Sequence, residues 1–194
     1  MRIRNDLIAN FEHRGNGVKP NPIPSAWVNL RQTDTPINAL EKRLLAEIKA
    51  LYGKRLISVV VFGSAGRGTQ RCDSDLDVLV VADRLPRGRM KRVEEFSSVE
   101  NRIEPFLKSL QKTGIATDLS PVFKSPEEAE RGSPLFLDMV EDARILVDRN
   151  GFFEAVLKRL RGRLEKLGAR RIWMGNAWYW DLKPDYKPGE CFEL

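Results

Sequence analysis

The fold of this chain is decided by residues 59–81, VVVFGSAGRGTQRCDSDLDVLVV. Two apolar runs rich in β-branched residues, 59–62 and 76–81, enclose a segment of Gly, Ser, Arg, Thr and Asp. Short apolar runs bounded by glycine and polar residues are typical of buried β-strands that are joined by a loop. The stretch therefore predicts a strand, a glycine-rich polar loop and a second strand.

The glycine-rich loop has the composition of a phosphate-binding loop. Glycine lets the backbone approach a ligand closely, and a serine hydroxyl can donate a hydrogen bond to a phosphate oxygen. Where side chains are absent, successive backbone N–H groups can turn inward and form an anion-binding concavity. The small residues concerned are Gly63, Ser64, Gly66 and Gly68, and positive charge beside them comes from Arg67 and Arg71.

Two carboxylates, Asp75 and Asp77, open the second apolar run. On a strand the i, i+2 spacing puts both on one face, roughly 6 to 7 Å apart along the chain. Carboxylates at that separation can converge on one cation, and Mg²⁺ prefers carboxylate and phosphate oxygens. In the simpler interpretation, Asp73 and Asp75 are ordinary turn residues ahead of a buried strand. The Gly-Ser pair and the Asp-x-Asp pair occur together, each against its own apolar run, and this favours the metal site.

These residues resemble the signature of the DNA polymerase β-like nucleotidyltransferase superfamily. The similarity consists of Gly63-Ser64, ten intervening residues and Asp75-Leu76-Asp77, and it is specific over about residues 57 to 82. Arg67-Gly68 and Ser74 resemble its small stand-alone minimal nucleotidyltransferase branch in particular. The resemblance implies a mixed sheet with helices packed on it, two divalent metal ions and transfer of a nucleoside monophosphate from an NTP. It also implies a third carboxylate on a later strand.

Asp118 is the best candidate for that third carboxylate. It lies within 115–123, which reads as a strand, and shares a face with Ala116 and Ser120. A carboxylate in an apolar strand is costly unless its charge is compensated, and a metal ion shared with the first two acids could do so. A salt-bridged Asp at a strand end is the alternative. Weaker rivals lie on a predicted helix: Asp138, Glu141 and Asp142.

The rest of the chain predicts an α/β (α+β) fold, with a mixed β-sheet of about four to five strands and helices packed on it. Helices are expected over 36–53, 88–112 and 151–168, with Pro105 kinking or dividing the second. The segment 170–184 holds three of the four Trp residues and suggests a hairpin around Gly175-Asn176. Its aromatic side chains could stack a base, or could simply close a core. The expected organisation is an N-terminal arm (1–35), a nucleotidyltransferase core (36–150) and a C-terminal helix with an aromatic hairpin and tail (151–194).

Composition narrows the class of protein. With 33 Lys and Arg against 27 Asp and Glu, the net charge is +6, which suits a polyanionic ligand such as an NTP or a nucleic acid. The two cysteines lie far apart and form neither a metal-ligand spacing nor a disulfide framework. No segment resembles a signal peptide or reaches the roughly 18 apolar residues of a membrane span, so a cytoplasmic protein without a membrane partner is expected.

The predicted function is nucleotidyl transfer, with AMP from ATP as the expected group. Asp75, Asp77 and Asp118 would hold two Mg²⁺ ions (Mn²⁺ is an alternative) about 3.5 to 4 Å apart, with Asp118 as general base. Ser64 and the loop N–H groups would bind the phosphates, and Arg67 or Arg71 would offset developing charge. The acceptor stays open among a protein such as a HEPN-type toxin, an RNA end and a small molecule, and so does the oligomeric state. The alternative function is a non-catalytic, antitoxin-like module that binds nucleotide or RNA through the same loop.

Overall fold

The computed structural model describes residues 35–175 and 177–193. The predicted N-terminal arm, apart from Thr35, lies outside the described residues. From Pro36 onward the chain forms one compact unit. Among the helices of the described residues, none has the length and apolar composition needed to cross a membrane.

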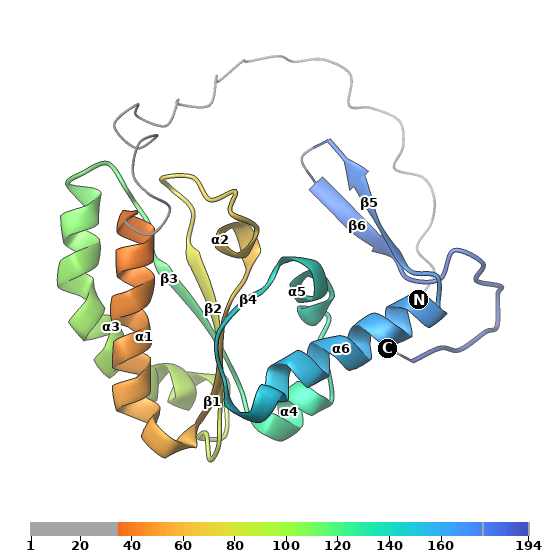
Figure 1. Cartoon of the computed structure of the whole chain (residues 1–194), viewed down its shortest axis with the longest axis horizontal. Helices are drawn as coiled ribbons and strands as arrows, with labels where there is room; N and C mark the ends of the chain where they lie inside the picture. Colours follow the sequence, from red (N-terminus) through yellow and green to blue (C-terminus); the bar gives the residue numbers. More distant parts are fainter. Residues whose placement is uncertain (1–34, 176, 194) are drawn as a thin grey trace. The chain divides into compact units, whose positions relative to one another are not determined.

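The centre of this unit is a four-stranded mixed sheet in the order β3-β2-β1-β4 (Figure 1). β1 pairs antiparallel with both β2 and β4, whereas β2 and β3 run parallel. The predicted mixed sheet with packed helices is therefore confirmed. The strands are β1 (Leu56–Val61), β2 (Leu76–Ala82), β3 (Leu119–Lys124) and β4 (Arg144–Asp148).

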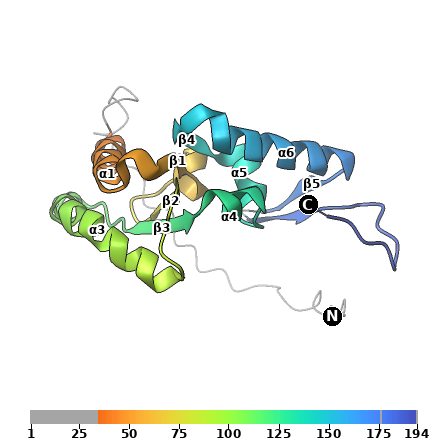
Figure 2. The same cartoon turned by 90° about the horizontal axis from the view of Figure 1, so that it is seen from below.

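Helices cover both faces of this sheet, as Figures 1 and 2 show. α1 and α3 lie side by side on one face, and α4, α5 and α6 lie on the other. A short helix, α2, follows β1 directly, and two 3₁₀ turns follow α1 and β4. The α-helices are α1 (Pro36–Tyr52), α2 (Gly63–Arg67), α3 (Arg89–Gln111), α4 (Pro126–Glu130), α5 (Phe136–Asp142) and α6 (Phe152–Lys166).

The packing of the core shows on which face of the sheet the Asp77 carboxylate lies. Leu79 and Val81 of β2 belong to the apolar cluster that includes Phe136 of α5 and Phe153 of α6. Because side chains alternate along a strand, Asp77 shares the face of Leu79 and Val81. The carboxylate therefore lies on the side of the sheet that α4, α5 and α6 cover, at the leading end of β2.

Two predicted elements differ from the structure. α3 is one helix through Pro105, so a division into two shorter helices is wrong. Pro105 and Asn101 are both exposed, so water can solvate the carbonyl that loses its partner. β3 begins at Leu119 rather than at residue 115. Ahead of it the chain bonds to the loop before β2: the Ala116 N–H donates to the Cys72 carbonyl at 2.7 Å, and the Thr117 hydroxyl to the Ser74 carbonyl at 2.8 Å.

The predicted aromatic hairpin is confirmed as a separate two-stranded sheet of β5 (Arg170–Met174) and β6 (Ala177–Asp181). Its strands pair antiparallel, with Trp173 opposite Trp178 and Arg171 opposite Trp180. Paired residues share a face, so these four side chains lie together on one side of the hairpin. Met174, Ile172 and Tyr179 belong to the other side.

Candidate active site

The glycine motif forms a helix rather than the predicted loop. α2 starts at Gly63, directly after the buried strand β1, and is capped by Gly68 in the left-handed conformation (φ 70°). The Gly66 N–H donates to the Phe62 carbonyl at 3.1 Å, and the Gly68 N–H to the Ala65 carbonyl at 3.3 Å. These two N–H groups are therefore used within the helix, and the predicted concavity cannot include them. The N–H groups at the start of a helix have no partner inside it, so the N–H groups of Gly63, Ser64 and Ala65 are not used within α2.

Gly63 holds the two halves of the motif together. Its φ is +64°, in the region that favours glycine, and a Cβ built there would lie 3.1 Å from the Asp77 Cγ and closer still to Oδ2. The neighbouring Phe62 N–H also donates to the Asp77 carbonyl at 3.1 Å. The missing side chain thus makes room for the Asp77 carboxylate, whereas the sequence had suggested only room for a phosphate.

Burial and neighbouring groups shift the pKa of the Asp77 carboxyl in opposite directions. Burial raises the pKa of its carboxyl above the ordinary value, and the charge of exposed Asp75 raises this pKa further. A hydrogen bond from the Ser120 side chain and the charge of Arg67 act in the opposite direction. Asp77 therefore carries its negative charge at a cost, next to a second carboxylate on the same strand face.

Asp118 lies one residue ahead of β3, and the pairing of β3 with β2 brings it beside these acids. Its carbonyl accepts a hydrogen bond from the Leu76 N–H at 2.9 Å, and Leu76 pairs with Leu119 across the parallel strands. This pairing puts Asp118 next to Asp75. Within residues 35–175 and 177–193, however, no group of three or more His, Cys, Asp or Glu side chains has a metal-binding arrangement. The structure thus brings the three acids to one end of two adjacent strands without converging their carboxylates.

The two predicted arginines have different surroundings. Arg71 is exposed and forms a bidentate pair with Asp73, with distances of 2.9 and 3.1 Å. Arg67, the last residue of α2, contacts Asp142 at 3.4 Å, and its guanidinium carbon lies 4.5 Å from the centre of the Trp178 ring. Arg67 is therefore the arginine that is built into the surroundings of the acids.

The weaker carboxylate candidates at 138 and 142 have structural partners. Asp138 accepts hydrogen bonds from the indole N–H groups of Trp178 and Trp180, at 2.8 and 2.9 Å. Asp142 pairs with Arg171 at 2.6 Å as well as with Arg67. Both acids hold the hairpin against α5. Their role depends on contacts between distant segments, and the only sequence signal for it is the coincidence of acids on one helix with Trp and Arg on a later hairpin.

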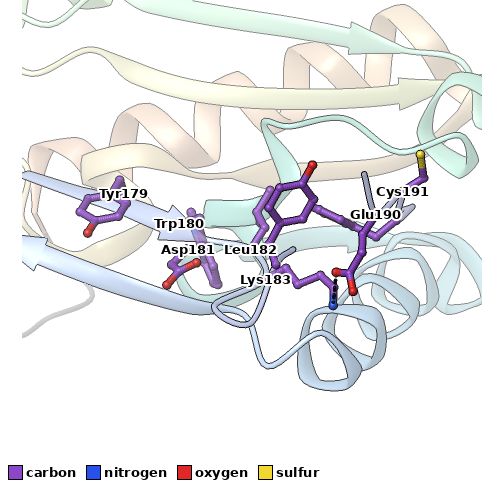
Figure 3. A pocket seen from close by; sticks show the side chains of 9 residues that line it. Tyr179, Trp180, Asp181, Leu182, Lys183, Glu190 and Cys191 are labelled. Carbon is purple, nitrogen blue, oxygen red and sulfur yellow. Dashed lines mark ion pairs between the residues drawn. The ribbon is translucent and has the colours of Figure 1, made fainter. Parts of the chain in front are cut away.

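A separate, open pocket of about 620 Å³ lies between β6 and the C-terminal segment (Figure 3). Its lining includes Tyr179, Trp180 and Cys191, and Lys183 is paired there with Glu190 at 3.0 Å. None of the predicted site residues lines it. The chemistry at the start of α2 and β2 is therefore distinct from this pocket.

Comparison with known proteins agrees with the geometry. The model of the family described as "Nucleotidyltransferase domain" matches residues 41–147, more than half of the chain. The "Putative protein adenylyltransferase MJ1305" of Methanocaldococcus jannaschii is 29% identical over 133 residues, which cover 68% of this chain and 85% of that protein. The segment that matches the family model contains the Gly63-Ser64 and Asp75-Leu76-Asp77 motif.

Among solved structures, a toxin–antitoxin crystal structure with AMP-PNP has a chain that aligns with a TM-score of 0.41 and 16% identity, covering 66% of this chain and 92% of that one. A chain of the toxin–antitoxin MntA-HepT aligns with a TM-score of 0.39 and 14% identity, covering 66% and 88%. The assignment rests on the match of the family model, which extends from α1 into β4 and includes α2, Asp75 and Asp77. The chain therefore belongs to the nucleotidyltransferase domain family.

Proposed function

We propose that this nucleotidyltransferase transfers AMP from ATP to a hydroxyl group of a protein. The observation that carries the proposal is the contact between Gly63 and Asp77, which holds a carboxylate against the first residue of a helix whose leading N–H groups have no partner inside the helix. At such a point, backbone N–H groups can bind phosphate oxygens directly beside a carboxylate. The family match and the similarity to a protein adenylyltransferase favour a transferase over a non-catalytic binding module.

The phosphate groups of ATP are assigned to the start of α2. The N–H groups of Gly63 and Ser64 and the Ser64 hydroxyl can donate to phosphate oxygens. Arg67 supplies positive charge from the other end of the same short helix, where Asp142 fixes its position. Arg71 is exposed and paired with Asp73, so we assign it a smaller part in offsetting charge.

We assign a hard divalent cation such as Mg²⁺ to the carboxylates of Asp75 and Asp77, whose oxygens are the ligand type that it prefers. The half-buried Asp77 of β2 and the exposed Asp75 just ahead of this strand offer carboxylate oxygens. Burial, together with the charge of Asp75, raises the pKa of Asp77, and a cation would stabilise its charged form. Asp118 on the neighbouring strand is the proposed third ligand. The chemistry that Mg²⁺ supplies in such a site is Lewis-acid stabilisation of charge on phosphoryl oxygens.

The proposed reaction is an in-line displacement at the α-phosphorus. The acceptor oxygen forms a bond to this phosphorus, the bond to the oxygen that bridges to the β-phosphate breaks, and pyrophosphate leaves. Asp118 is assigned as the base that takes the hydroxyl proton. It lies one residue ahead of β3, the edge strand that pairs with β2, whereas α2 follows β1 on the other side of β2. An acceptor hydroxyl on the β3 side would therefore approach Asp118 first.

The test is incubation of the protein with cell lysate and ATP labelled at either the α- or the γ-phosphate, followed by separation of protein from RNA. Relative to lysate alone, we expect additional label on protein from the α-position only, and no additional label when Asp77→Asn replaces the wild type. Label on RNA would reassign the acceptor. Equal labelling by the wild type and by Asp77→Asn would contradict the proposed chemistry.

A further inference from the structure

The aromatic hairpin lies outside the residues that match the family, yet it contacts the glycine motif that those residues contain. On α5, Asp138 accepts hydrogen bonds from the indole N–H groups of both Trp178 and Trp180. Asp142 of the same helix, with a side chain only 10% exposed, pairs with Arg171 of β5 at 2.6 Å. These contacts fix the hairpin against α5.

From this fixed hairpin, Trp178 reaches the last residue of α2. The Arg67 guanidinium carbon lies over the Trp178 ring, 4.5 Å from its centre. Trp178 is half-buried, and it also has the Trp173 ring 5.0 Å away and the Arg171 guanidinium carbon 5.4 Å from its centre. Because the ring is covered in this way, Trp178 serves packing within the protein, and one of the groups packed on it is the arginine of the glycine motif.

Most of the hydrogen-bonding capacity of Arg67 is unused. A guanidinium carries five N–H donors in its plane. In the part of the chain that the structure describes, the Arg67 side chain makes one hydrogen bond, from Nη1 to Oδ2 of Asp142 at 3.4 Å, and Arg171 binds the same oxygen at 2.6 Å. The Arg67 side chain is nevertheless only 20% exposed. Since unpaired donors of a largely buried cation carry a free-energy cost, this arrangement favours an anion that accepts hydrogen bonds from them.

The Arg67 guanidinium also lies within electrostatic range of the acids. Long side chains on an α-helix point back toward its N-terminus, and a helix of five residues rises only about 6 Å from first to last. This tilt directs the Arg67 side chain back along α2 toward Gly63, the residue in contact with the Asp77 carboxylate. The charge of Arg67 lowers the pKa of Asp77, in agreement with this placement. Arg67 can therefore act on phosphate groups that bind at the start of α2.

We infer that Trp178 is a positioning residue of the phosphate site, because its ring supports the face of the Arg67 guanidinium and leaves the N–H donors free for phosphate oxygens of the nucleotide. The inference rests on the proposed function, in which α2 binds these phosphates. An aromatic ring attracts a guanidinium without using any of its N–H donors, whereas a carboxylate partner occupies them. Arg67 is then ordered before the nucleotide arrives. Ordering a mobile arginine on binding would weaken the affinity by about threefold to tenfold.

The test is calorimetric titration with a non-hydrolysable ATP analogue and, separately, with tripolyphosphate, both in Mg²⁺. Trp178→Phe and Trp178→Leu are compared, because both lose the indole N–H but only the first keeps an aromatic ring under the guanidinium. We expect Trp178→Leu to weaken binding of both ligands about threefold to tenfold, and Trp178→Phe to retain most of the affinity. Met174→Ala is the control and should match the wild type, since Met174 is 68% exposed and lies on the other side of the hairpin.

Arg67→Ala provides a second measurement, which separates positioning from a purely structural role of Trp178. If Trp178 acts through Arg67, adding Trp178→Leu to Arg67→Ala should cause no further loss of affinity. A structural role would give the same loss with and without Arg67. Urea denaturation should show a cooperative transition for each variant, because Trp180 still donates to Asp138.

Three results would overturn the inference while nucleotide binding at α2 stands. Equal affinities of Trp178→Leu and Trp178→Phe would mean that the ring does not position Arg67. Equal losses from Trp178→Leu in the presence and in the absence of Arg67 would mean that Trp178 acts on the fold alone. Wild-type affinity of Arg67→Ala would mean that Arg67 does not bind the phosphates. If the wild type itself binds neither ligand, the proposed function fails and the inference fails with it.

Discussion

The absence of a side chain at Gly63 leaves room for the carboxylate of Asp77, and the backbone there has a φ of +64°. An added methyl group would meet Asp77 and would also strain the backbone. The strain alone costs roughly 1 to 2 kcal/mol for an L-residue in the left-handed region. The steric effect on Asp77 is additional and acts on the site.

Gly63→Ala should therefore reduce nucleotidyl transfer on the order of a hundredfold, the effect of a misplacement of about 1 Å in an active site. Gly53→Ala is the matched control, because Gly53 also has a positive φ of 49° but no atom within 4 Å of a built Cβ. Urea denaturation should show a loss of stability for Gly53→Ala from the backbone strain and a loss at least as large for Gly63→Ala, which also meets Asp77, and an assay of pyrophosphate release should show lost activity for Gly63→Ala alone. Equal activities of the two variants would mean that the position of Asp77 is not critical.

For single residues, the sequence predicted which acids lie near one another better than it predicted their contacts. Asp75 and Asp77 could be found because their spacing and the strand that follows are local features. The hydrogen bond from Ser120 and the pairing of Arg67 with Asp142 could not, because they join segments that are distant in the chain. Asp118 was identified as an acid near the pair, but local pattern does not determine whether three carboxylates converge.

Among the contacts between elements, the two ion pairs of Asp142 join three of them: Asp142 of α5 pairs with Arg67 of α2 and with Arg171 of β5. Asp142→Asn keeps the shape of the side chain and removes its charge, so two largely buried guanidinium groups lose their anionic partner. We expect the free energy of unfolding to fall by about 1.5 to 3 kcal/mol, the range for hydrogen bonds to charged groups. Affinity for the ATP analogue should fall as well, because Arg67 and Trp178 lose their fixed positions.

Asp73→Asn is the control for that measurement, because it removes an exposed pair in which the Arg71 side chain is 72% exposed. Exposed pairs contribute at most about 1 kcal/mol, so this variant should unfold almost like the wild type in urea. If the two substitutions cost the same, Asp142 does not hold the hairpin.

Most elements could be predicted from the sequence, because their apolar periodicity is long enough to identify them. The helix predicted over 36–53 is α1 and that over 151–168 is α6, and the mixed sheet and the hairpin are also as expected. α2 was missed because five residues are too few for a helical period to show. The start of β3 was placed too early, because residues 115–117 have a strand-like pattern but bond to the loop at 72–74 instead of β2.

For the whole molecule, the family match and the fold agree with the function predicted from residues 59–81, and nucleotidyl transfer is confirmed as the function of the chain. The assignment of Mg²⁺ and of the individual site residues stays a prediction. A ligand that binds only the native state stabilises it by mass action, by about 2.7 kcal/mol at a hundred times its Kd. For a chain of this size, that corresponds to a rise in Tm of roughly 5 to 10 °C.

We therefore expect Mg²⁺ together with a non-hydrolysable ATP analogue to raise the Tm of the wild type by this amount in differential scanning calorimetry. NaCl at matched ionic strength should have no such effect. Asp75→Asn and Asp77→Asn should abolish the rise, and Asp118→Ala should abolish it if Asp118 is the third ligand. An undiminished rise in both the Asp75 and the Asp77 variants would rule out the metal site at β2.

The contacts of Asp142 can form only after all of their residues have been synthesised. Arg67, Asp142 and Arg171 leave the ribosome in that order, and the first and the last are 104 positions apart in the sequence. At about 5 to 20 residues per second, roughly 5 to 20 s pass between synthesis of the glycine motif and synthesis of the hairpin that secures its arginine. A nascent chain therefore completes its sheet, whose last strand ends at Asp148, before it completes the surroundings of Arg67, and it acquires full capacity for nucleotide only after the hairpin is synthesised.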